Sequence, residues 1–273
     1  MVVFPNAKIN LGLLVTEKRP DGFHNIQTVF YPVPLREALE LLPSSGGEIK
    51  FMVSGKEVPG GTQNNIILKA WQMLKDDFGL PGATIHLHKT IPIGAGLGGG
   101  SSDAAFMLKL ARQVFDLDVS DEELMDYARR LGSDCAFFIL NKPVAAFGRG
   151  DEFSKIQLDL SAYHLVIVKP EIHIGTAEAY AWVKPSAPKH DIMEIIRQPV
   201  SEWKKHLTND FEPPVFEKYP LIGEIKSRLY RHGALYASMS GSGSAVYGIF
   251  PENPGLEDAF EGHFYWEGKL SME

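Results

Sequence analysis

Pro92-Ile-Gly-Ala-Gly-Leu-Gly-Gly-Gly-Ser-Ser-Asp-Ala-Ala105 is the stretch around which the rest of the chain can be arranged. Five of its fourteen residues are glycine, and its last five predict the start of a helix over residues 101–113. Glycine lets the backbone adopt positive φ and lets a ligand approach the main chain closely. The first turn of a helix adds unpaired N–H groups and the positive end of a dipole. The stretch therefore predicts an anion site, and the anion it favours is a nucleotide phosphate.

Other known loops fit these glycines less well. Gly94, Gly96 and Gly99 have the spacing of dinucleotide-binding proteins, but residues 114–118 lead into another helix instead of the required second strand. No lysine follows the glycines, as a P-loop requires. The Asp-Phe-Gly at residues 77–79 precedes the glycines and no His-Arg-Asp occurs, which argues against a protein kinase. A flexible loop with Ser101 as a helix cap stays open as the plainest alternative.

The composition sets broad limits on fold and function. A chain of 273 residues can form one large domain or two of ordinary size, and 44% hydrophobic residues suffice for real cores. No apolar run approaches the ~20 residues of a membrane span, and no signal-peptide pattern opens the chain. A net charge of −7 argues against a nucleic-acid surface. One cysteine leaves no internal disulfide and is typical of a reducing compartment, so we expect a cytoplasmic protein.

The N-terminal part predicts strands joined by turns. Residues 9–15 and 25–33 read as strands, and Lys8 and Asn10 share a face because strand side chains alternate. An exposed edge strand would explain this pair equally well. The Pro-Asp-Gly turn before His24 leaves that residue open to a structural role. Residues 44–47 predict a hairpin turn within 37–53, residues 64–74 a helix with an asparagine cap, and residues 83–88 a strand before the glycines.

The middle of the chain carries one isolated charge. A capping box at residues 120–123 predicts a helix to about Arg130. Asp134 is the only charge in the apolar run 131–139, so we expect it to be partly buried. A buried aspartate is costly unless it is paired or hydrogen-bonded, and a purely structural acid remains an alternative. Cys135 is interpreted as a small packed side chain because no histidine motif accompanies it.

The C-terminal part contains a second, shorter glycine loop. The pattern changes around residues 152–161, where we place a domain boundary. Residues 163–168 predict a strand, 174–180 the start of a helix, and 186–206 loops with short helices. Residues 208–212 read as a helix-start cluster or a ligand site. Ser240-Gly-Ser-Gly-Ser244 is not a nucleophile elbow, because its glycines flank Ser242 at one residue and not at two.

These motifs together resemble the GHMP superfamily of small-molecule kinases, which includes galactokinase, homoserine kinase and mevalonate kinase. The proline, Gly-Leu-Gly and Ser-Ser of residues 92–102 match its phosphate loop. Three further matches are Ala7-Lys-Ile-Asn10, Asp21-Gly-Phe-His24 and Gln27-Thr-Val-Phe30, which resemble the opening of the diphosphocytidyl-methylerythritol kinases. The resemblance implies an α+β, two-domain GHMP-kinase fold. Residues 1–155 would be a ribosomal-protein-like, ATP-binding domain, and residues 156–273 a ferredoxin-like α/β sandwich.

The resemblance also implies an activity. It is ATP-dependent phosphorylation of the 2-hydroxyl of the cytidine diphosphate-linked methylerythritol, giving the 2-phosphate and ADP in non-mevalonate isoprenoid biosynthesis. The alternatives are another GHMP kinase of homoserine or mevalonate type and a non-catalytic nucleotide-binding regulator. The partner would be a small molecule, with no nucleic acid or membrane, and the protein a monomer or weak homodimer. The cofactors would be ATP and Mg²⁺, with the metal on Ser102 or its neighbour Ser101.

The family's residues carry over to matching positions of this chain. Lys8 would neutralise the transferring phosphate, and Asp134, in a Gly-x-Asp-x-x-Phe motif, would be the base. A nearby Lys8 would lower the pKa of that aspartate and make it a weak base, which leaves orientation of the hydroxyl and the lysine as the alternative role. Trp182 competes with Tyr180 as the ring that stacks on cytosine. The implied ATP-binding residues are Asn65, Pro92, Gly94, Gly96, Leu97, Gly98, Gly99, Gly100, Ser101 and Ser102. The implied substrate-binding residues are Asn10, Phe23, His24, Phe30, Thr176, Tyr180, Gly241 and Ser242.

Overall fold

The computed structural model describes residues 1–57 and 65–272, which form two compact units. Unit 1 contains residues 1–7, 35–93 and 98–142. Unit 2 contains residues 8–34, 94–97 and 143–273. The glycine stretch therefore contributes to both units, with residues 94–97 in unit 2 and the helix that follows in unit 1.

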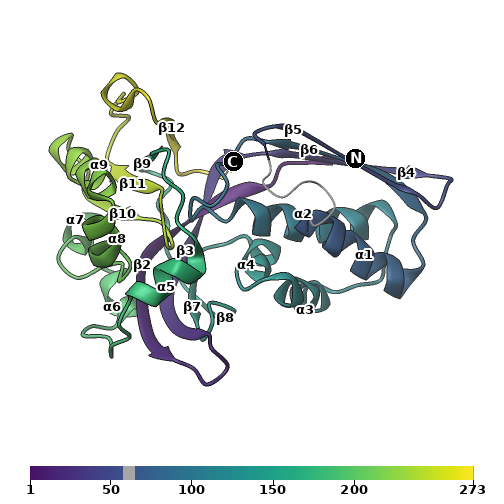
Figure 1. Cartoon of the computed structure of the whole chain (residues 1–273), viewed down its shortest axis with the longest axis horizontal. Helices are drawn as coiled ribbons and strands as arrows, with labels where there is room; N and C mark the ends of the chain where they lie inside the picture. Colours follow the sequence, from purple (N-terminus) through teal and green to yellow (C-terminus); the bar gives the residue numbers. More distant parts are fainter. Residues whose placement is uncertain (58–64, 273) are drawn as a thin grey trace. The chain divides into compact units, whose positions relative to one another are not determined.

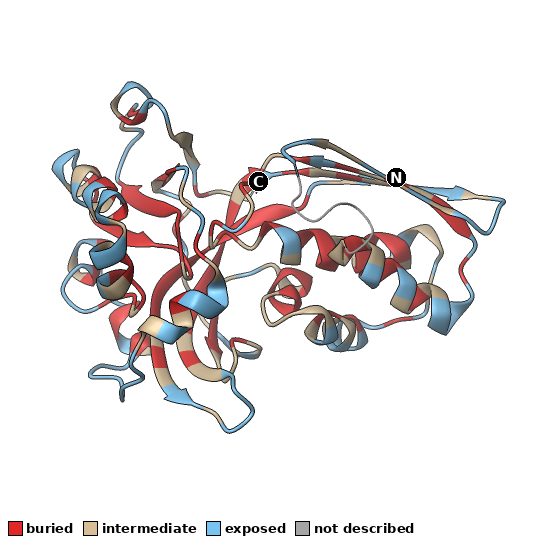
Figure 2. Ribbon diagram, viewed as in Figure 1, coloured by how far each residue is buried: buried red, intermediate tan, exposed pale blue. Residues whose placement is uncertain are grey.

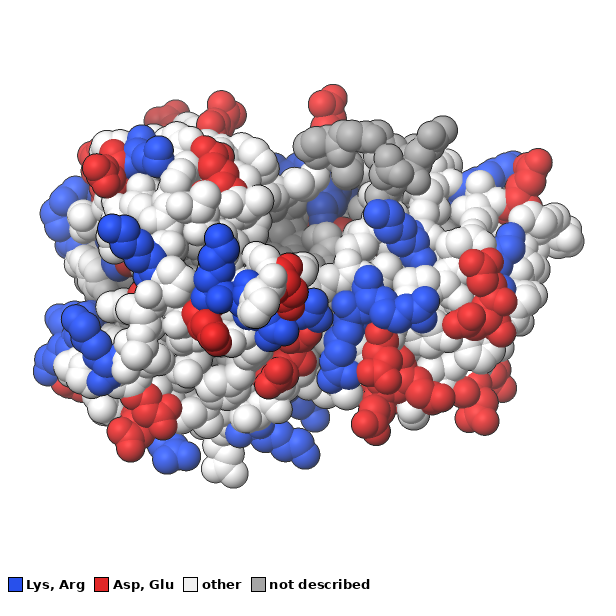
Figure 3. Space-filling view, turned by 60° about the horizontal axis from the view of Figure 1, so that its bottom comes forward, with Lys and Arg blue, Asp and Glu red and all other residues white. Residues whose placement is uncertain are grey.

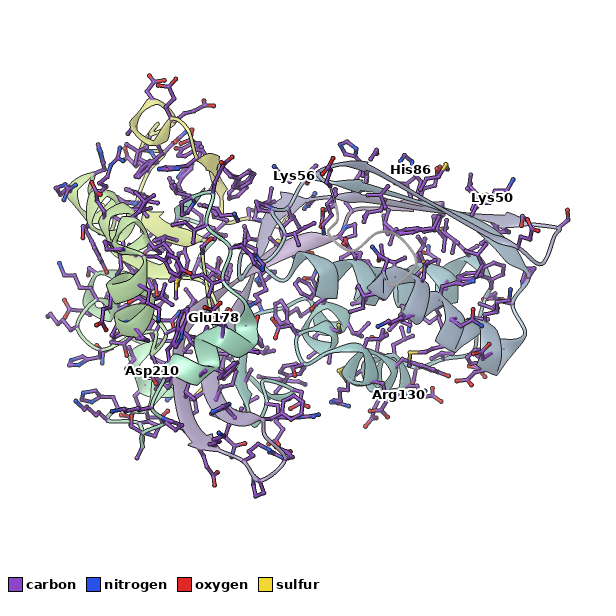
Figure 4. The ribbon with its side chains drawn as sticks, in the orientation of Figure 1. Lys50, Lys56, His86, Arg130, Glu178 and Asp210 are labelled. Atoms are coloured by element: carbon purple, nitrogen blue, oxygen red, sulfur yellow. The ribbon has the colours of Figure 1, made fainter. Side chains whose placement is uncertain are left out.

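Unit 1 is a four-stranded sheet with helices on one side (Figure 1). The strand order is β1-β4-β6-β5, in which β1 and β4 run antiparallel to their neighbours and β5 runs parallel to β6. Lys50 and His86 stand on the side of the sheet away from the helices (Figure 4). The strands are β1 (Val2–Val3), β4 (Ala38–Ser44), β5 (Ile49–Gly55) and β6 (Gly82–Lys89), and the helices are α1 (Ile66–Phe78), α2 (Gly99–Val114), α3 (Asp121–Leu131) and α4 (Cys135–Leu140).

The predicted hairpin at residues 44–47 is wrong, because β6 lies between β4 and β5. The start of β6 bonds to the turn itself, with Gly82 N–H donating to Gly46 O and Ala83 N–H to Glu48 O. Residues Ala83, Ile85 and Leu87 of β6 are buried, which suits a central strand. Which strands pair depends on residues that are far apart in the sequence. The alternation of residues 37–53 therefore could not predict that β6 lies between β4 and β5.

Helix α2 begins two residues earlier than expected, and much of its length is buried (Figure 2). Its N-cap is Gly98, so the alternative of Ser101 as the cap is wrong. Small residues on α2 (Ala104, Ala105 and Ala111) are buried and allow close packing against its neighbours. The capping box of Ser120 and Glu123 opens α3 as predicted.

Unit 2 contains two further four-stranded sheets. Their orders are β2-β3-β7-β8 and β10-β11-β9-β12, and the second is antiparallel throughout. One apolar core includes Val166 and Val168 of β9, Ile225 and Leu229 of α9, and Phe211. The strands are β2 (Asn6–Lys18), β3 (His24–Arg36), β7 (Val144–Phe147), β8 (Glu152–Lys155), β9 (His164–Lys169), β10 (Tyr236–Met239), β11 (Val246–Phe250) and β12 (Phe264–Lys269). The helices are α5 (Thr176–Trp182), α6 (Ile192–Ile195), α7 (Val200–Trp203), α8 (Glu212–Lys218), α9 (Pro220–Arg231) and η1 (Asp258–Phe260).

The segment from Asn209 to Asp210 is attached to the edge of β2 within unit 2. Leu13 N–H donates to Thr208 O, and Asp210 N–H donates to Leu13 O, both at about the ideal length. The Asp210 carboxylate (Figure 4) accepts Val15 N–H at 2.8 Å. This attachment fixes the start of α8 and, through Asn209, reaches the second glycine loop.

The surface carries acidic and basic side chains intermixed on the face seen in Figure 3. Within the described residues, no helix has the length and apolar character needed to cross a bilayer.

Candidate active site

The glycine stretch uses its glycines for backbone shape. Gly94, Gly96 and Gly98 have φ of 61°, 75° and 71°, a region that other residues rarely adopt. A Cβ on Gly96 would lie 1.9 Å from the carbonyl oxygen of Ser240, so this position also needs glycine for space. A Cβ on Gly100 would meet nothing within 4 Å. The predicted need for positive φ is therefore confirmed at alternate residues of the loop.

The loop is held by its carbonyl groups. In unit 2, Lys8 N–H donates to Leu97 O at 2.9 Å, Ser240 Oγ donates to Gly96 O at 2.8 Å, and Ala245 N–H donates to Ala95 O at 3.2 Å. Within the described chain, the N–H groups of Gly96, Leu97 and Gly98 donate to no protein acceptor. A loop whose carbonyls are bound and whose N–H groups are available can accept an anion without rearranging.

The first turn of α2 brings two serines and a cysteine together in unit 1. The Ser101 hydroxyl hydrogen-bonds Cys135 Sγ, and burial raises the pKa of that thiol to about 12. Cys135 thus stays protonated, as expected for a packed side chain. Ser102 is fully buried, and its Oγ has no hydrogen-bond partner among the described residues. The Ser102 hydroxyl oxygen therefore has no protein partner among the described residues and is a donor atom of the kind that Mg²⁺ prefers.

A buried charge cluster that the sequence did not reveal lies beneath the start of α2. The Lys89 ammonium donates to Glu37 and, at 2.7 Å, to Asp103, and all three side chains are almost fully buried. Glu37 also accepts the N–H groups of Thr90 and Ile91, just before the glycine stretch. Burial and the neighbouring Glu37, opposed by Lys89, raise the pKa of Asp103 to about 8. The cluster joins the residues before the glycine loop to the helix after it.

Lys8 and Asn10 share a face, as their alternation predicted. Lys8 Nζ donates to Asn10 Oδ1 at 2.6 Å and lies 4.9 Å from the centre of the Phe30 ring. The Asn10 amide donates onward to Thr28 Oγ1 at 3.0 Å. All of these groups are buried, with Lys8 only 3% exposed. The alternative of an exposed edge strand is wrong in its exposure, because β2 is an edge strand but the polar groups of this face form one buried network.

Asp134 is half-buried at the N-cap of α4 in unit 1, and it makes no side-chain cap hydrogen bond to that helix. It directly precedes Cys135, so the bond from Ser101 to Cys135 links the start of α2 to the residue beside Asp134. The expected partial burial is confirmed. Lys8 and Asp134 belong to different units.

Two aromatic contacts mark the predicted substrate side in unit 2. The His24 imidazole stacks on the Tyr180 ring at 4.7 Å with an interplanar angle of 17°. Burial, with a smaller contribution from Lys18, lowers the pKa of His24 below its ordinary value of 6.5. Phe23 is exposed beneath the Arg149 guanidinium at 5.1 Å. Trp182 lies under the Lys218 ammonium instead, so Tyr180 and not Trp182 stacks on His24.

The second glycine loop is fixed by Asn209. Its amide donates to Met239 O at 2.8 Å and to Gly241 O at 2.9 Å, and its oxygen accepts Phe211 N–H. Glu212 accepts Met239 N–H at 2.8 Å and pairs with Lys226 at 2.6 Å. The cluster at residues 208–212 thus supports backbone, in agreement with the structural alternative.

Two further predicted residues, Asn65 and Thr176, lie at helix starts. Asn65 is the N-cap of α1 and accepts Ile67 N–H at 2.9 Å, while Asn64 lies outside the described residues. Thr176 is exposed at the start of α5, which Gly175 caps. Within the described chain, no group of three or more metal-binding His, Cys, Asp or Glu side chains occurs. A Mg²⁺ ion usually keeps waters and binds substrate phosphates, so it needs no such cage.

Comparison with known families agrees with this geometry. The GHMP kinases N terminal domain matches residues 65–142, and the GHMP kinases C terminal domain matches residues 192–262. The chain is 53% identical over 99% of its length to the whole of 4-diphosphocytidyl-2-C-methyl-D-erythritol kinase of Bacteroides fragilis. The chain belongs to this family of GHMP kinases. As a GHMP kinase it uses ATP to phosphorylate a small molecule.

Solved structures of GHMP kinases share the fold. A crystal structure of 4-(cytidine 5'-diphospho)-2C-methyl-D-erythritol kinase matches with a TM-score of 0.82 and 32% identity over 98% of both chains. The mevalonate kinase of Methanococcus jannaschii matches with a TM-score of 0.72 and 16% identity over 98% of this chain and 97% of that one. The second likeness concerns the fold alone. The α+β, two-domain GHMP-kinase fold implied by the motifs is confirmed.

Proposed function

We propose that this chain transfers the γ-phosphoryl group of ATP to the 2-hydroxyl of 4-diphosphocytidyl-2-C-methyl-D-erythritol. The products are the 2-phosphate and ADP, and the step belongs to non-mevalonate isoprenoid biosynthesis. The observation that carries the proposal is the 53% identity to an enzyme of that name over 99% of the chain. Homoserine and mevalonate kinases are the alternatives that share only the fold.

The phosphates of ATP bind at the N–H groups of Gly96, Leu97 and Gly98 and at the start of α2. Positive φ at alternate glycines and the bound carbonyls support this role, because both turn donors toward a ligand. Mg²⁺, when bound, neutralises charge on the phosphates. Ser102 Oγ fits a ligand for it, with Ser101 beside it. The other residues of the ATP side are Asn65, Pro92, Gly94, Gly99 and Gly100.

Lys8 and Asp134 act on the reacting groups. The 2-oxygen forms a bond to the γ-phosphorus while the bond from that phosphorus to ADP breaks. The hydroxyl proton passes to the Asp134 carboxylate, or Asp134 orients the hydroxyl and solvent takes the proton. The Lys8 ammonium offsets charge on the transferring phosphoryl group, and Asn10 fixes its position through the 2.6 Å bond. Phosphoryl transfer depends mainly on such positioning and charge stabilisation.

The cytosine base binds beside His24 and Tyr180. A neutral imidazole has one N–H donor and one acceptor, which suits the mixed edge of cytosine, and the lowered pKa of His24 favours that neutral form. Aromatic faces stack on any base, so Tyr180 and Phe23 supply affinity and His24 supplies discrimination. Phe30 supports the pocket from beneath Lys8. Thr176, Gly241 and Ser242 bind the rest of the substrate.

The proposed function also extends to the domains of the chain, its location in the cell and its oligomeric state. By sequence, residues 1–155 form the ATP-binding domain and residues 156–273 the C-terminal domain, and the two family matches fall on either side of that division. This division differs from the two compact units, because residues 8–34, 94–97 and 143–155 belong to unit 2. The protein works in the cytoplasm as a monomer or weak homodimer, without nucleic acid. A single, protonated cysteine supports the location.

Phosphorus NMR of a reaction with Mg-ATP and the cytidine substrate tests the proposal. We expect ADP and one new phosphomonoester signal in equal amounts. Lys8→Ala and Asp134→Ala should each lose at least about a hundredfold in kcat while still binding ATP. His24→Ala should raise KM for the cytidine substrate far more than KM for ATP. Unchanged turnover in both Lys8 and Asp134 variants would remove the catalytic assignment, and equal KM effects would make His24 structural.

A further inference from the structure

His173 presents an imidazole for which the proposed mechanism has no use. It lies in unit 2 between β9 and α5 and is exposed. Within the described residues it makes no hydrogen bond, ion pair or ring contact. Its ring nevertheless packs closely on the glycine loop, since a Cβ on Gly94 would lie 2.6 Å from His173 Cε1 and 2.7 Å from Nδ1. Its Nε2 is farther from that point, at 3.9 Å.

The backbone on either side of His173 is fixed. The Ile172 carbonyl accepts Ser244 Oγ at 2.5 Å and the Lys169 ammonium at 3.4 Å, and Ile172 N–H donates to Pro170 O at 2.7 Å. On the other side, Ile174 is buried in the core of unit 2. The exposed imidazole is therefore presented from a supported segment, and the second glycine loop supplies part of that support through Ser244.

The position of this imidazole matters because of the loop beneath it. Gly94 directly precedes residues 95–97, whose carbonyls accept hydrogen bonds from the protein. The N–H groups of Gly96 to Gly98 have no protein acceptor among the described residues. An imidazole N–H is a good donor to an anion, and a protonated imidazole adds charge. The His173 ring and the glycine loop beneath it both have N–H donors without a protein acceptor among the described residues. Such a group of donors favours an anion, and phosphate is the anion that both substrates carry.

We propose that His173 binds a phosphate oxygen of one of the two nucleotide substrates, an inference that rests on the proposed function. ATP carries a triphosphate and the cytidine compound a diphosphate, so both substrates offer phosphate oxygens. The glycine loop favours ATP, whereas Thr176 and Tyr180, a few residues further along the chain, favour the cytidine compound. The donor is Nε2, the ring nitrogen farther from Gly94.

Three variants separate this role from simple packing on Gly94. His173→Phe keeps a planar ring over the loop and removes the donors. His173→Gln keeps an N–H near the place of Nε2 and removes the ring. His190→Ala is the matched control, because His190 is another exposed histidine of unit 2, and its ring contacts that of His206 and not the glycine loop. Each variant is first checked for native circular dichroism and melting temperature.

Steady-state kinetics in both substrates then read out the role. We expect His173→Phe to raise KM for one substrate about tenfold or more, with a much smaller change in kcat and in the other KM. His173→Gln should recover most of that affinity, and His190→Ala should match the natural chain. The substrate whose KM rises identifies the phosphate. A His173→Phe variant with unchanged KM for both substrates, or a loss confined to kcat, overturns the proposal.

A failure of the proposed function gives a different result. In that case the natural chain itself does not turn over the cytidine substrate. Calorimetric binding of Mg-ATP and of cytidine diphosphate to the natural chain and to His173→Phe still measures the role of His173. Weaker binding of either nucleotide to the variant supports the inference, and equal binding of both contradicts it.

Discussion

The two glycine loops of this chain have similar composition and differ in how their N–H groups are used. In the first loop, residues 95–97 use their carbonyls to bind protein donors, and the N–H groups of Gly96 to Gly98 have no protein acceptor among the described residues. In the second loop, the Ser240 and Gly243 N–H groups donate to protein carbonyls, the Ser240 and Gly241 carbonyls are also bound, and the N–H groups of Gly241, Ser242 and Ser244 have no protein acceptor among the described residues. The first loop thus offers three consecutive N–H groups, whereas those of the second loop are interrupted by the Gly243 N–H, which is already bonded. An unbroken run of donors, and not glycine content, is what suits the first loop to a phosphate.

Gly96 is the point where breaking this arrangement should have the largest effect. Gly96→Ala places a Cβ 1.9 Å from the backbone of Ser240 at a φ of 75°, so both loops must move apart. We expect a loss of about 3 kcal/mol or more in the free energy of unfolding, and no measurable kinase activity. Urea unfolding and an ADP-release assay measure the two effects.

Gly100→Ala is the matched control for stability. Gly100 lies in helical backbone at the start of α2 with open space around it. The change should stabilise the chain by about 0.5–1 kcal/mol. Equal losses of stability in the two variants would show that the contact between Gly96 and Ser240 is not what holds the loops.

Ser240 tests the support more gently. Ser240→Ala removes the donor to Gly96 O, in a part-buried bond, and the acceptor of Asn10 N–H, in a buried one. We expect a cost of about 1–3 kcal/mol in stability and a lower kcat. Ser242→Ala, in the same loop but half-exposed, should stay within about 0.5 kcal/mol by urea unfolding. A larger cost at Ser242 than at Ser240 would contradict the assignment of Ser240 as the connecting residue.

Asp103 sharpens the comparison through pH. The folded chain raises the pKa of this carboxyl from 3.8 to about 8, so between those values it holds a proton that the unfolded chain releases. The free energy of unfolding should therefore fall as pH rises through this window and level off above it. Asp103→Asn removes this contribution. Urea unfolding of both proteins at about pH 5 and about pH 8 should show the smaller fall in the variant. Parallel pH profiles would refute the buried, protonated carboxyl.

Asn65 should give the smallest effect. Asn65→Ala removes the cap of α1 and should cost about 1 kcal/mol in stability. If Asn65 serves only as a cap, KM for ATP stays the same. If it also contacts adenine, KM for ATP rises in the variant while KM for the cytidine substrate does not.

Much of the site could be predicted because its signals are local. Positive φ at alternate glycines, the shared face of Lys8 and Asn10, and the partial burial of Asp134 each follow from a few neighbouring residues. The cluster of Glu37, Lys89 and Asp103 could not be predicted, since its members are 52 and 14 residues apart and only the fold unites them. The one available signal was Lys89, because it follows the alternating apolar residues of β6 at a position where a buried side chain is expected.

The wrong hairpin has the same physical origin. Residues 44–47 do turn the chain, but which strands pair was decided by β6, whose apolar face fills the middle of the sheet. The supporting role of Asn209 was likewise invisible, because its partners Met239 and Gly241 are about thirty residues away. The local sequence pattern predicted the first glycine loop, whereas the contacts that hold it come from residues far apart in the sequence.

The most direct test of the account is ADP release from Mg-ATP with three alcohols: 4-diphosphocytidyl-2-C-methyl-D-erythritol, mevalonate and homoserine. We predict turnover with the cytidine compound alone. Turnover with mevalonate or homoserine instead would keep the kinase and remove the cytosine pocket at His24 and Tyr180. No turnover with any of them, despite measurable ATP binding, would contradict the central claim that the first glycine loop positions ATP for transfer to this substrate.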